Sequence, residues 1–279
     1  MMPDPTRPRL PLSVLILTKN EESRLPTCLR SVAECDDIVV LDSGSTDRTV
    51  EIARAAGARV LVNPFRDFAQ QRNFGMAAGA FRHPWVFHLD ADETMTPELV
   101  RECAALPADA PCEGYYAAPR MMFHGHWLRR CTDFPAWQAR CVRTGKFEFV
   151  QAGHGQREAP GMRMGYLQGT YLHDISVPDL AEWEAKHRRY AREEAEAFLA
   201  QPQLPIAQLW RGGPLGQRRA LKQLSYALPA RPLLRFIYQY FLRGGALDGR
   251  AAWGYCRLLA RYERFAAEAL REARRRSRG

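Results

Sequence analysis

Short apolar runs separated by polar turns dominate the first hundred residues. The run from Leu12 to Thr18 is apolar almost throughout, which is typical of a strand buried on both faces of a parallel sheet. Helical spacing of apolar residues follows Ser23, whose side chain is a suitable N-cap. The same patterns predict strands over 38–41, 60–62 and 85–89, and helices over 48–56 and 68–80. This alternation predicts an open, mostly parallel α/β sheet flanked by helices.

The pattern changes after Pro107. Aromatic, small and basic residues alternate around Gly125, which predicts strands and a loop rather than a helix. Residues 179–200 have the spacing of an amphipathic helix, and prolines follow it. Residues 221–269 then combine apolar and aromatic stripes with arginines, interrupted by a Gly-Gly pair. We therefore expect a C-terminal helical extension beyond the sheet.

The positive charge is confined to that extension. Residues 205–279 contain 16 Lys and Arg against 4 Asp and Glu, whereas residues 1–204 contain 24 against 27. Such a segment suits an anionic membrane surface or a nucleic acid. No recognised nucleic-acid-binding motif accompanies it, so we expect no nucleic-acid partner.

The compartment follows from the termini and the cysteines. Residues 1–11 are polar and proline-rich, without the apolar run of a signal peptide, and we expect a disordered tail. Uninterrupted apolar stretches are too short for a transmembrane helix. The seven cysteines form no C-x-x-C pair and are odd in number, which argues against a zinc ribbon or a disulfide framework. We expect a cytoplasmic protein.

Acidic residues follow three of the predicted strands. Glu21, Asp42 and the pair Asp90 and Asp92 each come at or just after a strand's carboxyl end. Because ligands bind in the crevice beyond the carboxyl ends of such strands, the three acidic loops should face one cleft. A divalent cation that carries a diphosphate would offset their charge. The alternative for the pair is a solvated acidic turn.

Three blocks of sequence carry a resemblance to a known family. They are "SVLILTKNEESRLPTCLRSV", "IVVLDSGSTDRTVEIARAAGARV" and "WVFHLDADETMTPEL". In this order and spacing they resemble the nucleotide-sugar-binding half of family 2 inverting glycosyltransferases with the GT-A fold, and are most similar to bacterial enzymes of lipopolysaccharide core and exopolysaccharide synthesis. Any one block alone would be a weak signal.

The resemblance implies a donor site and a metal. It implies that Asn20, Glu21 and Asp42 hold the base and ribose, and that the D-x-D pair holds ribose and a diphosphate bound to Mg²⁺ or Mn²⁺, with Asp92 and Asp90 as metal ligands. The implied contacts to the nucleotide-diphosphate sugar are Thr18, Asn20, Glu21, Asp42, Arg72, Asp90, Gln138 and Arg140. For Asp47 a helix-capping role is favoured over ligand contact. A surface salt bridge is the alternative role for Arg140, and Arg143 is a second candidate for the diphosphate.

The acceptor side is less regular. Inverting transfer needs a base that takes the proton of the acceptor hydroxyl. Relatives place an acidic pair just before the Gln-x-Arg element, where this chain has Pro135-Ala136. Our candidates for the base are, in order, Glu158, Asp133 and His154. One or two of the following aromatic residues should contact sugar: Trp127, Phe134, Trp137 and Phe149.

The resemblance also divides the chain and suggests its partners. We expect a glycosyltransferase domain over 12–204, with a nucleotide-sugar-binding half at 12–106 and an acceptor half at 107–204, and a basic amphipathic extension at 205–279. The extension resembles membrane-facing helices, which suggests a saccharide or lipid-linked acceptor at the inner membrane surface. Packing on the domain and a homodimer interface are its alternatives. A sugar nucleotidyltransferase is the competing enzyme class, but it would be expected to have a Gly-rich loop after the first strand, and Lys19 to Glu22 contain no glycine.

Overall fold

The computed structural model describes residues 9–152, 155–200, 213, 217 and 230–276. Contacts divide the chain into two compact units. The first unit is Met1–Met122 with Phe134–Ile175, and the second is Phe123–Asp133 with Ser176–Gly279. The predicted boundary at residue 204 and most of the predicted N-terminal tail lie outside the described residues.

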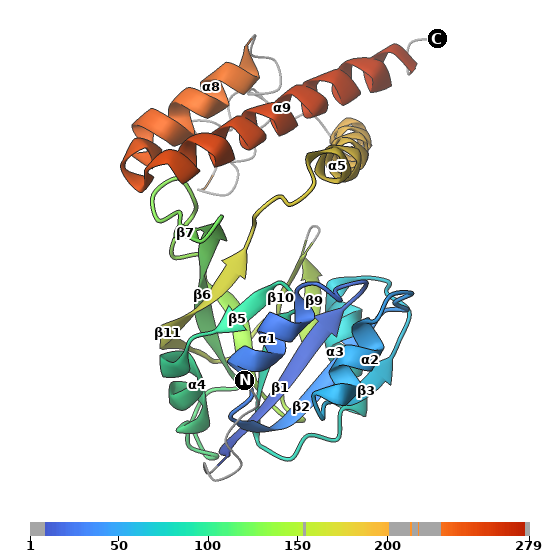
Figure 1. Ribbon diagram of the computed structural model, residues 1–279, viewed down its shortest axis with the longest axis vertical. Helices are drawn as coiled ribbons and strands as arrows, with labels where there is room; N and C mark the ends of the chain where they lie inside the picture. The colour runs from blue at the N-terminus through green and yellow to red at the C-terminus, as the bar shows by residue number, and fades with distance from the viewer. Residues whose placement is uncertain (1–8, 153–154, 201–212, 214–216, 218–229, 277–279) are drawn as a thin grey trace. The chain divides into compact units, whose positions relative to one another are not determined.

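The first unit is built on a mixed sheet (Figure 1). Its strands run in the order β3-β2-β1-β4-β8-β6-β11-β5. Their bounds are β1 Leu10–Thr18, β2 Cys35–Asp42, β3 Arg59–Val62, β4 Trp85–Asp90, β5 Glu93–Met95, β6 Gly114–Phe123, β8 Gln138–Arg143 and β11 Met164–Asp174. The four strands predicted from the apolar runs are confirmed, and β3, β2, β1 and β4 are parallel neighbours. A separate hairpin is formed by β9 (Phe149–Ala152) and β10 (Gly155–Glu158).

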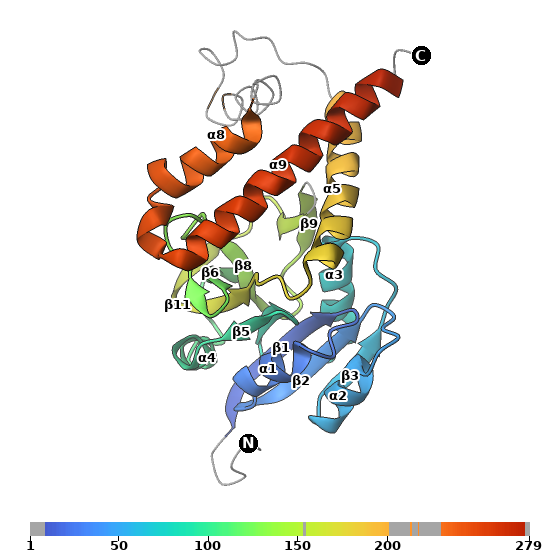
Figure 2. The same ribbon diagram turned by 45° about the horizontal axis from the view of Figure 1, so that its top comes forward.

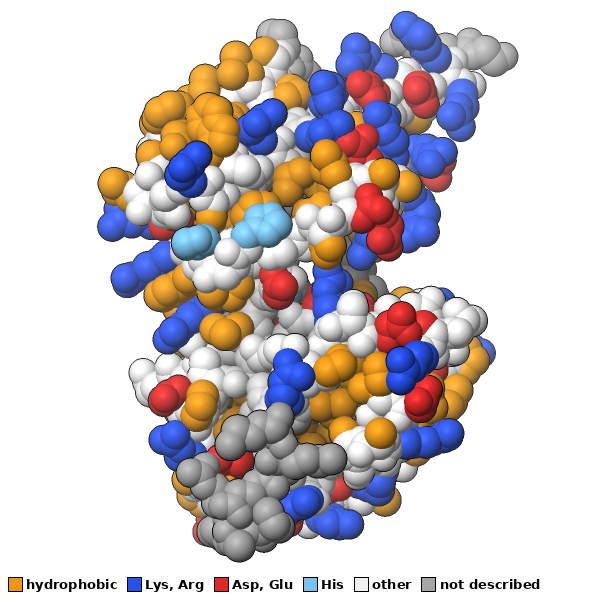
Figure 3. Space-filling model, in the orientation of Figure 1, with side chains coloured by type: hydrophobic (Ala, Val, Ile, Leu, Met, Phe, Trp, Pro, Cys, Tyr) orange, Lys and Arg blue, Asp and Glu red, His pale blue; other side chains and the backbone are white. Residues whose placement is uncertain are grey.

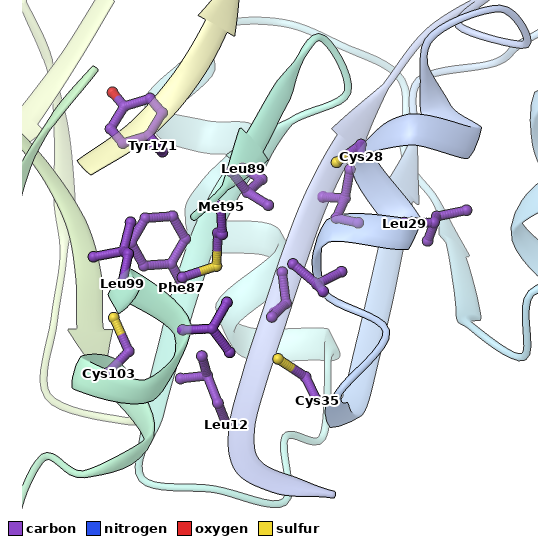
Figure 4. Close-up of a cluster of buried hydrophobic side chains, with 14 of the residues drawn as sticks. Leu12, Cys28, Leu29, Cys35, Phe87, Leu89, Met95, Leu99, Cys103 and Tyr171 are labelled. Atoms are coloured by element: carbon purple, nitrogen blue, oxygen red, sulfur yellow. The ribbon is translucent and has the colours of Figure 1, made fainter. Parts of the chain in front are cut away.

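Helices cover both faces of this sheet. They are α1 (Leu25–Ser31), α2 (Thr49–Ala55), α3 (Phe68–Ala78) and α4 (Pro97–Ala104). Alternate residues of β1 point to opposite faces, as the period of a strand requires. Leu12, Val14 and Ile16 pack with α1 and α4 in the larger core cluster, part of which Figure 4 shows. Leu15 and Leu17 pack on the other face, toward α3.

The helix starts differ in part from the prediction. Ser23 does not cap α1, which begins after Arg24 without a side-chain cap. Asp67 and Thr96 do cap α3 and α4, each accepting a backbone N–H of the first turn. Asp47 lies just before α2, and its carboxylate accepts bonds from the N–H and hydroxyl of Thr49. Asp47 thus accepts a backbone N–H at the start of α2, but the N-cap residue of this helix is Arg48 and has no side-chain cap.

Antiparallel pairing sets the second half of the sheet apart. β8 lies between β4 and β6 and runs antiparallel to both. β5 is a short antiparallel edge strand beside β11. The prediction of strands after Pro107 is confirmed. The order of these strands in the sheet could not be predicted from hydrophobic periodicity.

The second unit is helical. It contains α5 (Leu180–Ala200), α8 (Arg231–Ile237), a π-helical turn η1 (Tyr238–Leu242), a 3₁₀ turn η2 (Gly245–Asp248), α9 (Arg250–Arg276) and the short β7 (His126–Trp127). α5 and α9 lie side by side (Figure 2), joined by a cluster that includes Phe198, Phe265 and Leu270. Within the described ranges, none of the helices combines the length and the apolar character that crossing a membrane requires. Six of the seven cysteines are buried as free thiols.

Candidate active site

Three strand ends meet at the carboxyl edge of the first unit's sheet. β1 lies between β2 and β4, with Thr18 opposite Asp42 on one side and Leu17 opposite Asp90 on the other. Glu21 follows in the loop after β1. The strand register therefore brings the three predicted acidic loops to the same edge, where open α/β sheets bind ligands.

Asp42 organises the turn that follows β2. Its side chain is buried, and its Oδ2 accepts the backbone N–H groups of Gly44 and Ser45 at 2.9 Å each. Its Oδ1 accepts the hydroxyls of Ser45 at 2.5 Å and Thr18 at 3.2 Å. Gly44 has φ 86°, in the left-handed region that favours glycine. Four hydrogen bonds thus hold the carboxylate in one orientation.

The loop after β1 is attached to this turn. Asn20 donates its backbone N–H to Ser45 Oγ at 2.8 Å, and its Oδ1 accepts the N–H of Thr46 at 2.8 Å. Glu21 donates its N–H to Thr49 Oγ1 at 2.8 Å. The first two acidic loops therefore form one hydrogen-bonded surface.

Two buried arginines hold Asp90, and one of them also holds Glu93. Arg72 Nη2 lies 2.8 Å from Asp90 Oδ1, and Arg140 Nη2 lies 3.5 Å from Asp90 Oδ2 and 2.8 Å from Glu93 Oε1. Glu93 Oε2 also accepts the backbone N–H of Asp90 at 2.9 Å. Arg72, Arg140 and Glu93 are at most 3% exposed in their side chains. This is a buried network rather than a solvated acidic turn.

The network separates the proton affinities of its two carboxyl groups. Burial opposes ionisation of Asp90, but the guanidinium groups of Arg72 and Arg140 outweigh it and lower the pKa of Asp90. Burial dominates at Glu93; against the attraction of Arg140 and with the added repulsion of Asp90, it raises the pKa of Glu93 to about 7. The two neighbouring carboxyl groups therefore differ in the direction of their pKa shifts.

Asp92 faces an imidazole on the other side of this network. His173 Nε2 lies 3.4 Å from Asp92 Oδ2, and His173 Nδ1 lies 3.6 Å from Glu93 Oε1. Burial opposes the charged imidazole, but its bond to Asp92 prevails, so the pKa of His173 is raised. Both side chains are about a quarter exposed, at 27% and 28%. The antiparallel pairing of β5 with β11 sets His173 opposite Glu93. Sequence reasoning missed His173 because more than eighty residues separate it from the D-x-D pair.

The two arginines predicted to bind diphosphate, Arg140 and Arg143, differ in position and contacts. Arg140 is buried, so the alternative prediction that it forms a surface salt bridge is wrong. Its guanidinium also lies 4.8 Å from the centre of the Tyr171 ring and bonds Gln138 Oε1 at 2.8 Å. Arg143 pairs with Trp85 at the opposite end of β4 from Asp90. Arg143 donates to the carbonyls of Ala108, Ala110 and Cys112, which is a structural role, so the alternative that it binds diphosphate is wrong.

Arg72 retains unused hydrogen-bonding capacity. Only its Nη2 bonds Asp90; among the described residues its buried Nε and Nη1 have no acceptor. A buried guanidinium without acceptors is costly, so an incoming anion near Asp90 would complete its bonding. Beside the Asp42 turn, Gln71 of the same helix donates to Ser43 Oγ at 3.1 Å. There a cavity of about 250 Å³ is lined by Asn63, Pro64, Arg66, Gln70, Gln71 and Phe74.

Glu158 lies on the hairpin that packs against α3. Glu158 pairs with Phe149 across the hairpin. The Asn73 side chain donates to the carbonyl of Phe149 at 2.8 Å and accepts its N–H at 2.9 Å. The Phe149 ring lies 6.0 Å from the guanidinium of Arg72. Burial and a hydrogen bond to Glu158 raise the pKa of Tyr116 to about 12. Glu158 therefore lies on a hairpin that α3 holds through Asn73, and it contacts Tyr116 of β6.

Three aromatic rings line the surface next to Glu158. Tyr166 lies between Tyr116 and Trp137, with ring centres 5.2 and 5.0 Å apart. Trp137 and Tyr166 are 43% and 57% exposed. We call Tyr116, Trp137 and Tyr166 the aromatic wall. The two tyrosines were not predicted, because only the pairing of β6 with β11 brings them together.

The remaining candidates lie on other parts of the chain. Phe149 is buried in the core, and Trp127 belongs to the second unit. Phe134 is half-buried. Asp133 also belongs to the second unit, where its carboxylate pairs with Arg243 at 2.5 Å. His154 lies outside the described residues.

The donor set at Asp92 suits a divalent cation that is shared with a substrate. Across the described ranges no three His, Cys, Asp or Glu side chains are grouped as a complete metal site. Asp92 and His173 nevertheless offer one oxygen and one nitrogen at a partly exposed position. Such a pair fits an ion that takes its other ligands from phosphate oxygens and water.

Fold and site together define an α/β domain with a polar ligand-binding edge. Residues 13–150 match the family model described as glycosyl transferase family 2. These residues therefore form a family 2 glycosyltransferase domain. The expected α/β sheet flanked by helices is confirmed. The match favours a glycosyltransferase over the nucleotidyltransferase and nucleic-acid-binding alternatives.

Individual relatives agree with this assignment. The lipopolysaccharide core biosynthesis glycosyltransferase LpsC of Rhizobium meliloti is 39% identical over 176 residues, covering 60% of this chain and 64% of that protein. An uncharacterized glycosyltransferase of Rickettsia typhi is 37% identical over 107 residues, covering 38% and 36%. The match thus spans less than two thirds of either relative.

Two solved structures are also similar. Staphylococcus aureus TarS 1-349 in complex with UDP-GlcNAc is 14% identical with a TM-score of 0.43, covering 94% of this chain and 92% of that one. Glucosyl-3-phosphoglycerate synthase of Mycobacterium tuberculosis, in complex with Mn²⁺, UDP-glucose and phosphoglyceric acid, is 25% identical with a TM-score of 0.32, covering 42% and 45%.

Proposed function

We propose that this protein is an inverting glycosyltransferase that moves a sugar from a nucleoside diphosphate to a hydroxyl of a saccharide or lipid-linked acceptor. The observation that carries the proposal is the Asp90 network at the carboxyl edge of a family 2 domain. Arg72 and Arg140 fix Asp90, while Asp92 stays accessible beside His173. A diphosphate placed there would meet both a divalent cation and the unfilled donors of Arg72.

The donor would lie along the edge formed by the three acidic loops. Asp42 and Asn20, fixed by the turn after β2, would hold the ribose and base, with Thr18 and Glu21 beside them. Asp92 and His173 would hold Mg²⁺ or Mn²⁺. The ion would supply positive charge that stabilises the diphosphate as it departs. Arg140 acts through Asp90 and Glu93, which it keeps in place, and Gln138 bonds Arg140 in turn.

Glu158 is the base in this proposal. It takes the proton from the acceptor hydroxyl while that oxygen forms a bond to the anomeric carbon. The bond from this carbon to the diphosphate oxygen breaks, and its electron pair leaves with the nucleotide. Attack from the face opposite the leaving group inverts the anomeric centre. The hydrogen bond with Tyr116 orients the Glu158 carboxylate.

The aromatic wall would hold the acceptor. Exposed rings with a few polar groups nearby are typical of small-molecule sites, and the flat faces of sugar rings pack on them. Trp137 directly precedes Gln138 on β8, which links the wall to the Asp90 network. Because LpsC is named for lipopolysaccharide core biosynthesis, we place the acceptor in lipopolysaccharide or exopolysaccharide synthesis.

The location completes the proposal. We place the protein in the cytoplasm, docked on the inner membrane through α8, α9 and the turns η1 and η2 between them. Leu242 and Leu247 are 75% and 72% exposed, which is unusual for leucines on a water-facing surface. They suit a bilayer interface, where arginines around them would meet anionic lipid.

Donor binding tests the central claim. Calorimetric titration with UDP, GDP, ADP and CMP, each with and without Mn²⁺, should show binding to one nucleotide that depends on the metal. Asp92→Asn and His173→Ala should each remove the metal dependence. The matched control is Asp109→Asn, an exposed carboxylate away from the strand ends, which should leave binding unchanged. Metal-independent binding that Asp92→Asn leaves intact would contradict the proposed site.

A further inference from the structure

The second unit exposes a large apolar surface. It consists of Leu233, Leu234, Ile237, Tyr238, Phe241, Leu242, Leu247 and Trp253, each at least 38% exposed. The ring of Trp253 lies 4.9 Å from Phe236 and 5.2 Å from Tyr240, so α8, η1 and α9 form one continuous patch. Hydrophobic side chains gather over α8 with Lys and Arg among them (Figure 3). We call this the exposed apolar surface.

A groove of about 510 Å³ borders this surface. Its lining residues come from the starts of α5 and α8 and from the middle of α9: Leu180, Pro232, Gly254, Arg257, Leu258, Ala260, Arg261 and Arg264. Pro232 adjoins Leu233, and Gly254 adjoins Trp253, so the groove and the exposed apolar surface share a border. All of these residues belong to the second unit.

Three arginines occupy one wall of the groove. Arg257, Arg261 and Arg264 follow one another at spacings of four and three, which places them on one face of α9. Arg261 is paired with Glu184 of α5, while Arg257 and Arg264 are exposed. Apolar side chains, among them Leu180 and Leu258, form much of the remaining lining. The groove therefore joins a cationic wall to an apolar one.

From this arrangement we infer that the groove binds the phosphate of an anionic phospholipid while the exposed apolar surface enters the bilayer. A lipid has its charge and its apolar chains on opposite sides of one short boundary. On the protein, the charged Arg257 and the apolar Trp253 likewise lie on opposite sides of the border between groove and surface. The inference rests on the proposed membrane docking and adds a defined headgroup site to it.

Charge favours a lipid over a second copy of the chain. In a symmetric pair the same patch meets itself, so the three arginines would approach like charges. The segment 205–279, with 16 basic and 4 acidic residues, is complementary to an anionic bilayer instead.

Vesicle binding of the full chain tests the site. Phosphatidylcholine vesicles with and without phosphatidylglycerol should be compared for wild type, the groove variant Arg257→Gln with Arg264→Gln, and the control variant Arg271→Gln with Arg275→Gln. The control removes the same charge from exposed positions of α9 outside the groove. The groove variant should lose roughly 30-fold in affinity for anionic vesicles, and the control several-fold less. Donor binding by calorimetry should be unchanged in both.

Each other outcome overturns the site in a distinguishable way. Equal losses of vesicle affinity in the groove variant and the control variant would mean that the arginines act by general electrostatic attraction and that the groove is not a specific site. Loss only in Leu242→Ser with Leu247→Ser would leave apolar docking alone. Competition by inorganic phosphate that abolishes wild-type vesicle binding would indicate a free-anion site. A dimer in sedimentation that the leucine variant dissociates, without vesicle binding, would assign the surface to a second copy. Failure of donor binding in wild type would instead contradict the proposed function.

Discussion

At the scale of single residues, the candidate site depends on which charges have partners. Asp90 is fixed by two arginines, whereas the carboxylate of Asp92 faces the imidazole of His173, which is about a quarter exposed, at 3.4 Å. The D-x-D pair thus has two different roles despite its simple sequence. The first carboxylate organises buried cations, and the second is available to a ligand.

Arg140 and Glu93 provide the first prediction at this scale. Arg140→Gln should destabilise the protein by about 3 to 5 kcal/mol, because it leaves Glu93 fully buried without its charged partner. Adding Glu93→Gln should recover part of the loss. Chemical unfolding of both single variants and the double variant measures the coupling free energy. Additive losses would show that the pair is not coupled.

Asp37 provides a pH prediction away from the cleft. Burial opposes its ionisation, but bonds from Ser13, the Arg82 N–H and Arg59 prevail and lower its pKa below the usual 3.8. Its contribution to stability is therefore complete above pH 3.8 and is lost as pH falls through the lowered pKa. Unfolding of wild type and Asp37→Asn between pH 6 and about 2 should show a stability difference that shrinks toward acid. A difference that is constant with pH would contradict this.

At the scale of elements, α3 serves both halves of the site. Arg72 on its inner side pairs with Asp90, and the next residue, Asn73, holds the β9 strand through both backbone groups of Phe149. One short helix therefore positions the donor edge and the hairpin that carries Glu158.

Asn73→Ala should affect the position of the hairpin without affecting the donor edge. Loss of two hydrogen bonds should cost about 1 to 2 kcal/mol of stability and loosen the hairpin. We expect a lower kcat with little change in donor Kd, because Arg72 is untouched. The matched control is Ala77→Ser, an exposed position on the same helix outside the cavity beside the Asp42 turn. Equal effects on kcat and donor Kd would mean that the hairpin does not act separately from the donor site.

At the scale of the whole molecule, the sequence predicted the fold where strands that are neighbours in the sheet are also close in the chain. The apolar runs of β1 to β4 and the acids after them predicted the parallel half and its carboxyl edge. The meeting of His173 with Asp92 depends on an antiparallel pairing between distant segments, which leaves no periodic signal. Tyr116 and Tyr166 meet through a parallel pairing of strands that are also distant in the chain. The antiparallel register of β8 places Arg143 at the opposite end of β4 from Asp90.

The two units also separate chemistry from proposed docking, which yields a prediction about acceptors. Leu242→Ser with Leu247→Ser changes only exposed side chains of the second unit, so a soluble acceptor should react as before. With the acceptor embedded in vesicles, kcat/KM should fall roughly tenfold, since removing two leucines from a bilayer interface costs about 1 to 2 kcal/mol. Steady-state assays with both acceptor forms, and Arg271→Gln as a surface control, measure the difference. Equal loss with both acceptors would mean that these leucines support the fold or the chemistry rather than contact with the membrane.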